Sequence, residues 1–193
     1  MKLRLIVTED CPRNCAGCCN QDHALSSLPP LHVRNMPEVL EDCEMVMLTG
    51  GEPMLRPLTL DRIITEIRHN KPDIPIYVYT AGPTPESFRL SMEKQAAAST
   101  YFAVSDKVDG FTYTIHEPED IAPFASLLRA GVFRPEAQSL RLNVFGTISE
   151  EDFPADLRKA HALHDWAIKW NMQWIEDCPL PEGELLMQWQ RSI

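Results

Sequence analysis

Four cysteines stand close together near the N-terminus, in the stretch "TEDCPRNCAGCC" at residues 8–19. Cys11, Cys15 and Cys18 follow a C-x3-C-x2-C spacing, and Cys19 comes directly after the third of them. Thiolates are the usual ligands of iron–sulfur clusters. Three protein thiolates on a [4Fe–4S] cluster leave one iron open, and an open metal position is what catalytic zinc sites also keep. The spacing therefore favours a catalytic iron–sulfur site.

A structural zinc site is the main alternative for the same cysteines. Zinc takes four ligands in such sites, usually as two separated pairs. The adjacent side chains of Cys18 and Cys19 do not converge easily on one tetrahedral centre, so we assign Cys19 a non-ligand role. His23 is near enough in sequence to complete a Cys3His set. Cys43 and Cys178 lie in apolar contexts that are typical of small core residues. The cysteines alone leave both metals open.

A second motif, "LTGGEP" at residues 48–53, follows a short apolar run. Gly50 and Gly51 allow a sharp turn and a close approach of backbone to a ligand. Glu52 then presents a carboxylate, and Pro53 fixes the turn after it. A Gly-Gly-Glu loop is often without function when it stands alone. Its order after the three cysteines makes a shared site the better interpretation.

The elements that must position these motifs are short β-rich runs that alternate with helical patterns. We predict strands at residues 2–8, 45–50, 74–80, 110–116, 140–146 and 172–176. Helices are predicted at 57–70, 84–98, 118–131 and 149–170, with a weaker one near 34–42. This alternation predicts an α/β fold, in which a parallel sheet has its helices outside.

Six strands are too few for a closed eight-stranded barrel, which needs about 250 residues. We therefore predict a partial (βα)6 barrel, built as a single domain over residues 1–193. The tail at 179–193 is expected to cover an open barrel edge or an interface. In βα-barrels the ligand site lies at the C-terminal ends of the strands. The cysteine loop and the Gly-Gly-Glu loop both follow strands, so we expect them to open onto the same face.

Composition narrows the range of functions. The chain is 44% apolar and carries a formal net charge of −10. That charge argues against extended nucleic-acid binding, which depends on neutralising phosphates, and suits a small-molecule substrate or a protein partner. No apolar run reaches the roughly 18–20 residues that span a bilayer, and the N-terminus lacks the features of a signal peptide. We expect a cytoplasmic protein without a membrane span, in which thiols stay reduced.

The paired motifs resemble those of the radical S-adenosylmethionine superfamily, at the length of its smallest members. The resemblance rests on Cys11, Cys15 and Cys18 together with the segment 50–53. It implies that the three cysteines hold a [4Fe–4S] cluster, that the open iron takes the amino and carboxylate groups of S-adenosylmethionine, and that Gly-Gly-Glu binds the methionine amino group. It also implies a partial (βα)6 barrel, as read above from the strands.

The chain departs from this family at one position beside the cluster. An aromatic residue usually stands just before the third cysteine and packs near the adenine, whereas this sequence has Gly17 there. Polar residues on the fourth and fifth strands of the family commonly contact the ribose and the methionine carboxylate. By that resemblance, Thr114 and Asn143 are predicted cofactor contacts, and Arg141 is a candidate for the carboxylate.

The remaining candidates come from strand ends and from the cysteine loop. His116 and Glu176 are the candidate catalytic residues. Substrate contacts are predicted at five further positions: Asn20, Gln21, Asp22, His23 and Thr80. Single polar residues of this kind are often only β-formers or satisfied core groups, so each assignment depends on the barrel arrangement.

The predicted function is that of a radical S-adenosylmethionine enzyme, an oxidoreductase or lyase. The resemblance implies that an external donor such as flavodoxin or ferredoxin reduces the cluster, and that a 5′-deoxyadenosyl radical then takes hydrogen from a small-molecule substrate. We place that substrate in nucleotide or modified-base biosynthesis of the 7-deazapurine kind, although Cys19 and Asn20 stand where such synthases usually have a Thr.

Two alternatives stay open. An activating protein for a glycyl-radical enzyme would act on a protein substrate. A non-catalytic zinc or iron–sulfur interaction module would use the cysteines and His23, and it would leave the Gly-Gly-Glu loop unexplained.

Overall fold

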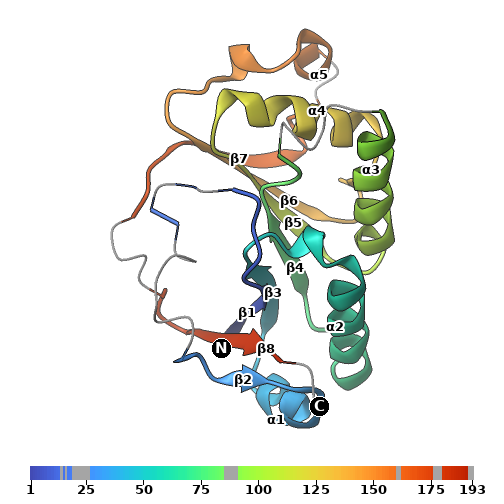
Figure 1. The fold of residues 1–193 in the computed structure, drawn as a ribbon, viewed down its shortest axis with the longest axis vertical. Coiled ribbons are helices and arrows are strands. Elements are labelled where there is room, and N and C mark those ends of the chain that lie inside the picture. Colours follow the sequence, from blue (N-terminus) through green and yellow to red (C-terminus); the bar gives the residue numbers. More distant parts are fainter. Residues whose placement is uncertain are drawn as a thin grey trace. The chain divides into compact units, whose positions relative to one another are not determined.

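The computed structural model (Figure 1) describes residues 1–13, 15, 17–18, 27–84, 91–159, 162–175 and 180–190. The chain divides into two compact units, one of residues 1–78 and 174–193 and the other of residues 79–173. The strands form one parallel eight-stranded sheet in the order β2-β8-β1-β3-β4-β5-β6-β7. This confirms the predicted α/β class with helices between parallel strands, and it is consistent with a partial barrel. The single-domain prediction stays a prediction.

In the first unit, β1 (Lys2–Thr8) is the central strand, and it pairs in parallel with β3 (Met45–Gly50) on one side and β8 (Glu184–Trp189) on the other (Figure 1). The two-residue strand β2 (Pro30–Leu31) extends the sheet beyond β8. The C-terminal segment thus returns to the first strand and completes this half of the sheet. The predicted strands at 2–8 and 45–50 have the bounds that the structure shows.

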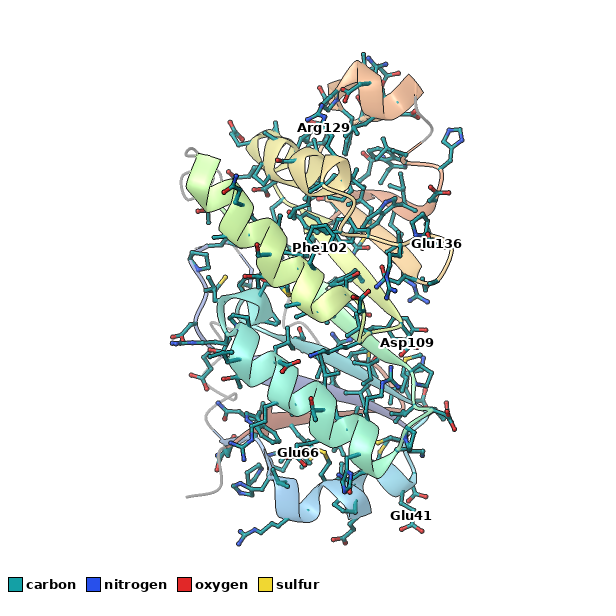
Figure 2. All side chains as sticks on the ribbon, turned by 90° about the vertical axis from the view of Figure 1, so that its right-hand side faces the viewer. Glu41, Glu66, Phe102, Asp109, Arg129 and Glu136 are labelled. Atoms are coloured by element: carbon teal, nitrogen blue, oxygen red, sulfur yellow. The ribbon has the colours of Figure 1, made fainter. Side chains whose placement is uncertain are left out.

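Helices α1 (Met36–Glu41) and α2 (Pro57–Asn70) belong to the same unit. Figure 2 shows α2 lying along one face of the sheet, with Glu66 on the helix side turned toward the viewer. The helix buries the apolar stripe predicted for residues 57–70, and its members are almost inaccessible to solvent: Leu60, Ile63, Ile64 and Ile67. Each such side chain contributes at most about 1.5–3 kcal/mol through burial. This stripe holds α2 against the face of the sheet (Figure 2).

The second unit contains the end of β4 (Ile76–Thr80), then α3 (Ser91–Ser105), β5 (Gly110–Ile115), α4 (Ile121–Arg129), β6 (Ser139–Phe145), α5 (Ala155–Lys159) and β7 (Trp166–Met172). Its core is aromatic. Phe133 meets Phe111 and Trp166 edge to face, with ring centroids 5.3 and 5.0 Å apart, and Phe124 lies 4.8 Å from Tyr113. Such offset and edge-to-face pairs add to the stabilisation that comes from burial alone.

The predicted helix at 149–170 and the predicted strand at 172–176 are wrong. Among the residues of that region that the structure describes, only 155–159 are α-helical, and the last strand of the second unit is β7. The sequence of β7, "WAIKWNM", alternates large apolar residues with the smaller or polar residues Ala167, Lys169 and Asn171, and this period of two is that of a strand. Trp166 and Trp170 are four residues apart, and this spacing also fits a helix, which is why the pattern misled.

Short 3-10 turns begin or replace helices at residues 33–35, 53–55, 118–120 and 150–152. The helix predicted at 118–131 is therefore a 3-10 turn followed by α4, and Gly131 ends it with φ +70° as predicted. Of the helix predicted at 84–98, residues 91–98 belong to α3, and residues 85–90 lie outside the described part of the chain. Within the described part of the chain, no helix is both long and apolar enough to cross a membrane.

Candidate metal centre

The end of β1 is attached to the Gly-Gly-Glu segment by backbone hydrogen bonds. The N–H of Gly51 donates to the carbonyl oxygen of Thr8 at 2.7 Å, and the N–H of Glu52 donates to that of Asp10 at 2.8 Å. Asp10 is the residue just before Cys11. The parallel pairing of β1 with β3, in which Thr8 lies opposite Gly50, brings the two segments to one edge of the sheet. The two sequence motifs therefore meet in space.

Two glycines make this close approach possible. A Cβ atom on Gly51 would lie 2.0 Å from the carbonyl oxygen of Asp10, a distance that no real side chain shows. A Cβ on Gly50 would lie 2.4 Å from the carbonyl oxygen of Thr8, and its φ of +124° is one that L-residues rarely adopt. The blocking atoms belong to backbone and cannot swing aside. Only glycine fits at either position.

Side chains tie the same loop to two further elements. Arg56, just before α2, donates from Nε to the Asp10 carboxylate at 2.9 Å and forms an ion pair with it through Nη2. The amide of Gln188, on β8, donates to Glu9 at 2.6 Å. The residues that lead into the first cysteine are thus fixed from three directions, by β3, by the start of α2 and by β8. The sequence motifs gave no sign of these ties, since each partner lies far away along the chain.

Glu52 is the carboxylate of the second motif, and it is buried, with 2% of its surface exposed. Its Oε1 accepts a hydrogen bond from the N–H of Met54 at 3.0 Å, across the 3-10 turn that Pro53 begins. A buried carboxylate must be compensated by hydrogen bonds or charges, because removing it from water is costly. Glu52 is therefore held in one orientation beside the cysteine loop.

All three motif cysteines carry free thiols; Cys11 is exposed, and Cys15 and Cys18 are half-buried. The N–H of Cys18 donates to the carbonyl oxygen of Cys15 at 3.3 Å, so the second and third cysteines share one turn. Within the described residues, no three His, Cys, Asp or Glu side chains converge on a point that would hold a single metal ion. A cluster binds its thiolates at separate corners, and three free thiols on one short loop are the donor set that it takes.

The pKa of the Cys11 thiol is affected by groups from both motifs. Loss of solvent around its sulfur is the largest effect and raises the pKa of the Cys11 thiol, whereas a hydrogen bond from the Arg13 backbone lowers it. The negative charges of Glu52 and Cys18 raise this pKa further. Metal ligands bind as thiolates, so binding at this site releases protons. Glu52 therefore lies close enough to the cysteine loop to share its electrostatic environment.

Gly17, which stands where the resemblance predicts an aromatic residue, lies against the indole of Trp174. A Cβ on Gly17 would be 3.1 Å from Cβ and 3.2 Å from Cγ of Trp174, and Gly17 has a left-handed φ of +71°. Trp174 keeps 41% of its surface exposed. An aromatic side chain from the far end of the chain thus occupies the space beside the residue before the third cysteine.

The predicted cofactor contacts on the later strands all belong to the second unit. Thr114 pairs with Asn143, and Thr112 pairs with Arg141, in the parallel register of β5 and β6. In-register residues on neighbouring strands share a face of the sheet. The structure therefore brings Thr114, Asn143 and Arg141 onto one face, as their alternation predicted, and their role with a cofactor stays a prediction.

Thr80 and His116 are both engaged within the second unit. The hydroxyl of Thr80 lies 2.7 Å from that of Tyr101 and accepts a hydrogen bond from the N–H of Gly82 at 3.0 Å. His116 lies at the end of β5, where its backbone N–H donates to the buried Asp120 carboxylate at 3.0 Å and its Nδ1 is 4.0 Å from the same oxygen. Asp120 thus orients the end of β5. The sequence motifs did not reveal this contact between Asp120 and His116.

Several predicted residues lie outside the described part of the chain. These are the substrate candidates Asn20, Gln21, Asp22 and His23, the catalytic candidate Glu176, and Cys19 and Cys178. Cys43, predicted as a core residue, is indeed buried.

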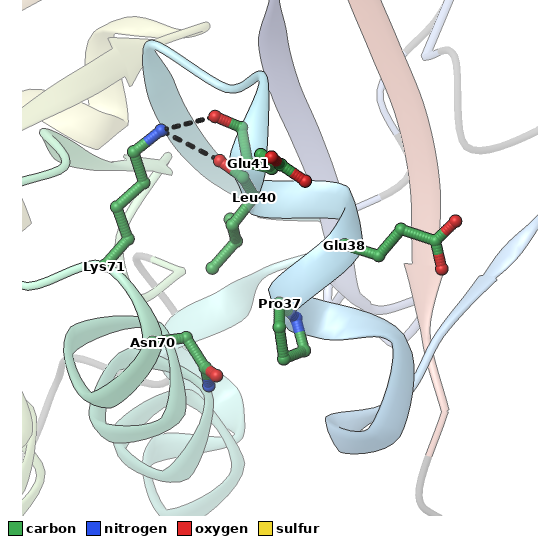
Figure 3. Close-up of a pocket in the computed structure, with 6 residues that line it drawn as sticks. All are labelled: Pro37, Glu38, Leu40, Glu41, Asn70 and Lys71. Carbon is green, nitrogen blue, oxygen red and sulfur yellow. Dashed lines mark hydrogen bonds between the residues drawn. The ribbon is translucent and has the colours of Figure 1, made fainter.

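A cavity of about 410 Å³ in the first unit lies near the start of β3, away from the carboxyl ends of the strands. Its lining includes Glu38, Asn70 and Lys71 (Figure 3). Lys71 does not present a free charge there, since Nζ donates to the carbonyl oxygens of Leu40 and Glu41 at 2.9 Å each. Residues at this end of parallel strands usually contribute to stability. Lys71 does so here, because its ammonium group holds the carbonyl groups at the end of α1.

Comparison with known proteins identifies the family but not a close relative. The sequence model of a family described as a 4Fe-4S single cluster domain matches residues 2–110, which is more than half of the chain. No curated protein matches the sequence. The matched region contains Cys11, Cys15, Cys18 and the Gly-Gly-Glu segment, and their donor set fits a cluster of this type. The chain belongs to the 4Fe-4S single cluster domain family.

Proposed function

We propose that this protein is a radical S-adenosylmethionine enzyme whose [4Fe–4S] cluster is held by Cys11, Cys15 and Cys18. When bound, such a cluster supplies one electron for cleavage of the cofactor. The family assignment supports iron–sulfur rather than zinc binding at these cysteines. The proposal that the bound cluster takes part in catalysis rests on the second motif, Gly50-Gly51-Glu52.

One observation carries it: Gly51 and Glu52 are hydrogen-bonded to the backbone of Thr8 and Asp10, directly before the first cysteine. A cluster domain that only transferred electrons would need its thiolates and no buried carboxylate beside them. Here a buried Glu52 stands next to the cysteine loop in a backbone that only glycine permits. A fixed carboxylate at that place suits the amino group of an amino-acid ligand, which is what S-adenosylmethionine presents.

The chain's own residues would bind and orient the cofactor. Glu52 would accept hydrogen bonds from the methionine ammonium group, and its burial strengthens that charge-assisted contact. Gly50 and Gly51 let the second motif pack directly on the backbone of Thr8 and Asp10, which would keep Glu52 beside the cysteine loop. Trp174 would offer an aromatic surface beside the third cysteine, where Gly17 has no side chain, and bases stack well on such surfaces. Thr114, Asn143 and Arg141 remain the proposed contacts to the ribose and carboxylate.

The test is cofactor cleavage under anaerobic conditions. The chain is reconstituted with iron and sulfide, reduced with dithionite and mixed with S-adenosylmethionine, and 5′-deoxyadenosine is measured. Cys15→Ala is the test variant, and Cys43→Ala is the matched control, because Cys43 is a buried thiol outside the motif. We expect 5′-deoxyadenosine from the wild type and from Cys43→Ala, and none from Cys15→Ala.

The possible failures of this test have different meanings. A brown, cluster-loaded wild type that forms no 5′-deoxyadenosine would contradict the catalytic proposal and favour a non-catalytic iron–sulfur interaction module. Equal product from Cys15→Ala and the wild type would contradict the ligand assignment. A glycyl radical on an added protein, formed together with 5′-deoxyadenosine, would favour the activating-protein alternative over a small-molecule substrate.

A further inference from the structure

Lys169 lies on an open face of the second unit. The sequence placed residue 169 on an outer helix, but β7 contains it, and both Ala167 and Lys169 are exposed. Trp166, one position before Ala167 in the alternation, is buried on the opposite face, 5.1 Å from the ring of Phe124. The strand therefore divides its side chains, with Trp166 in the aromatic core and Ala167 and Lys169 exposed on the other face.

The register of the sheet places this lysine beside the predicted cofactor contacts. Asn143 pairs with Thr114 on one side and with Lys169 on the other. Arg141 pairs with Thr112 and with Ala167, so Arg141 and Lys169 are diagonal neighbours on one face. We call this surface the β5–β7 polar face; its members are Thr114, Asn143, Arg141 and Lys169, while Thr112 on the same face is buried.

The charge of the β5–β7 polar face is opposite to that of the whole chain. The chain carries a net charge of −10, yet β5, β6 and β7, which the structure describes completely, contain no Asp or Glu. Arg141 and Lys169 are both exposed, and neither forms an ion pair with any described residue. Parallel sheets are usually covered on both faces, so two exposed cations on one face of β6 and β7 indicate a place for a ligand.

One cation would suffice for the carboxylate of S-adenosylmethionine, to which the resemblance assigns Arg141. Lys169 adds a second positive charge next to it, with Thr114 and Asn143 as hydrogen-bonding neighbours. Two cations are too few for a nucleic-acid groove, where phosphate contacts must be repeated along the backbone. They match a small molecule that brings one further anionic group of its own.

We propose that the β5–β7 polar face binds an anionic group, a carboxylate or a phosphate, of a small-molecule substrate, and that Lys169 is the residue that selects it. This inference rests on the proposed function for the identity of the molecule as a substrate. The binding of an anion to this face does not depend on it.

The test is a titration of the full, anaerobically reconstituted chain labelled with nitrogen-15, followed through its backbone amide NMR signals at constant ionic strength. Inorganic phosphate and malonate are titrated separately, so that the tighter probe distinguishes a phosphate from a carboxylate source. Lys169→Ala is compared with Lys107→Ala, which removes the same charge from an exposed turn of the same unit. Lys169→Arg keeps the charge.

We expect saturable shifts at Asn143 and Lys169 with at least one probe, a dissociation constant about tenfold higher in Lys169→Ala, and little change in Lys107→Ala. Lys169→Arg should retain most of the affinity. Shifts that never saturate, or equal losses in Lys169→Ala and Lys107→Ala, would overturn the proposal. The titration uses no S-adenosylmethionine and reads no activity, so its failure is distinct from a failure of cofactor cleavage.

Discussion

The two ends of the first unit's sheet use their polar groups in opposite ways. At the amino end, Lys71 donates to three carbonyl oxygens, of Leu40, Glu41 and Cys43, at 2.7–2.9 Å. The ammonium group of Lys71 is therefore fully hydrogen-bonded to backbone carbonyls at the end of α1. At the carboxyl end, Gly51 and Glu52 fix the loop that leads to free thiols. We therefore call the amino end, where Lys71 caps the carbonyl groups at the end of α1, the closing end, and the carboxyl end, where the cysteine loop lies, the binding end.

Gly51→Ala should break the binding end most severely. The new methyl group would meet the carbonyl of Asp10 at 2.0 Å, so the two motif segments must separate. We expect a loss of about 3 kcal/mol of unfolding free energy in urea and little iron bound after reconstitution. Gly183→Ala is the matched control, since nothing lies within 4 Å of its added carbon and only its positive φ is strained. A Gly51→Ala protein with full iron content would contradict the close approach.

Lys71→Met should weaken the closing end without affecting the binding end. The methionine keeps the apolar stem but removes the donor to the three carbonyls, and partial access of water limits the cost to about 1–2 kcal/mol. Urea unfolding measures this loss, while iron and sulfide per chain should equal those of the wild type. A parallel loss of cluster would show that the two ends are not independent.

Glu52→Gln separates binding from folding at the carboxyl end. The amide oxygen can still accept the hydrogen bond from Met54, so we expect a stability change of about 1 kcal/mol or less. The lost negative charge should lower the affinity for S-adenosylmethionine about tenfold, as measured by equilibrium dialysis on reconstituted protein. Unchanged affinity in this variant would remove Glu52 from the cofactor site.

Trp174→Ala tests whether the indole beside the third cysteine serves the cofactor. Loss of the half-exposed indole should weaken S-adenosylmethionine binding about fivefold, near the lower end of the range for one aromatic–base stack. Trp174→Phe should restore most of it, because the ring face is what the base uses. If alanine and phenylalanine behave alike, the indole serves only to pack against Gly17.

Glu44→Gln at the closing end should have the smallest effect. The ion pair of Glu44 with the N-terminal amino group, 3.3 Å long, is largely exposed to solvent. Exposed pairs contribute between zero and about 1 kcal/mol and are screened by salt. We expect a change in unfolding free energy within about 0.5 kcal/mol, which fades further in high salt. A larger loss would mean that this charge supports α1 as Lys71 does.

The sequence allowed much of this arrangement to be predicted where the signal was local. The strand at 2–8 and the helix at 57–70 follow from apolar periodicity, and their bounds are those of the structure. The meeting of the two motifs followed from the rule that parallel strands present their C-terminal ends together, and the pairing of β1 with β3 confirms it.

Other features depend on partners that are distant in the sequence. Lys169 was assigned to a helix because Trp166 and Trp170 satisfy both periods, and only the pairing of β7 with β6 decides between them. The contact of Trp174 with Gly17 brings together opposite ends of the chain, and no local pattern predicts it.

The most direct test of the central claim is the electron paramagnetic resonance spectrum of the reduced, reconstituted protein, recorded with and without S-adenosylmethionine. Three cysteine ligands leave one iron open, so the cofactor should change the g-values of the cluster in the wild type. We expect this change in the wild type and a much weaker one in Glu52→Gln at the same cofactor concentration. A cluster spectrum that S-adenosylmethionine leaves unaltered in the wild type would contradict the central claim.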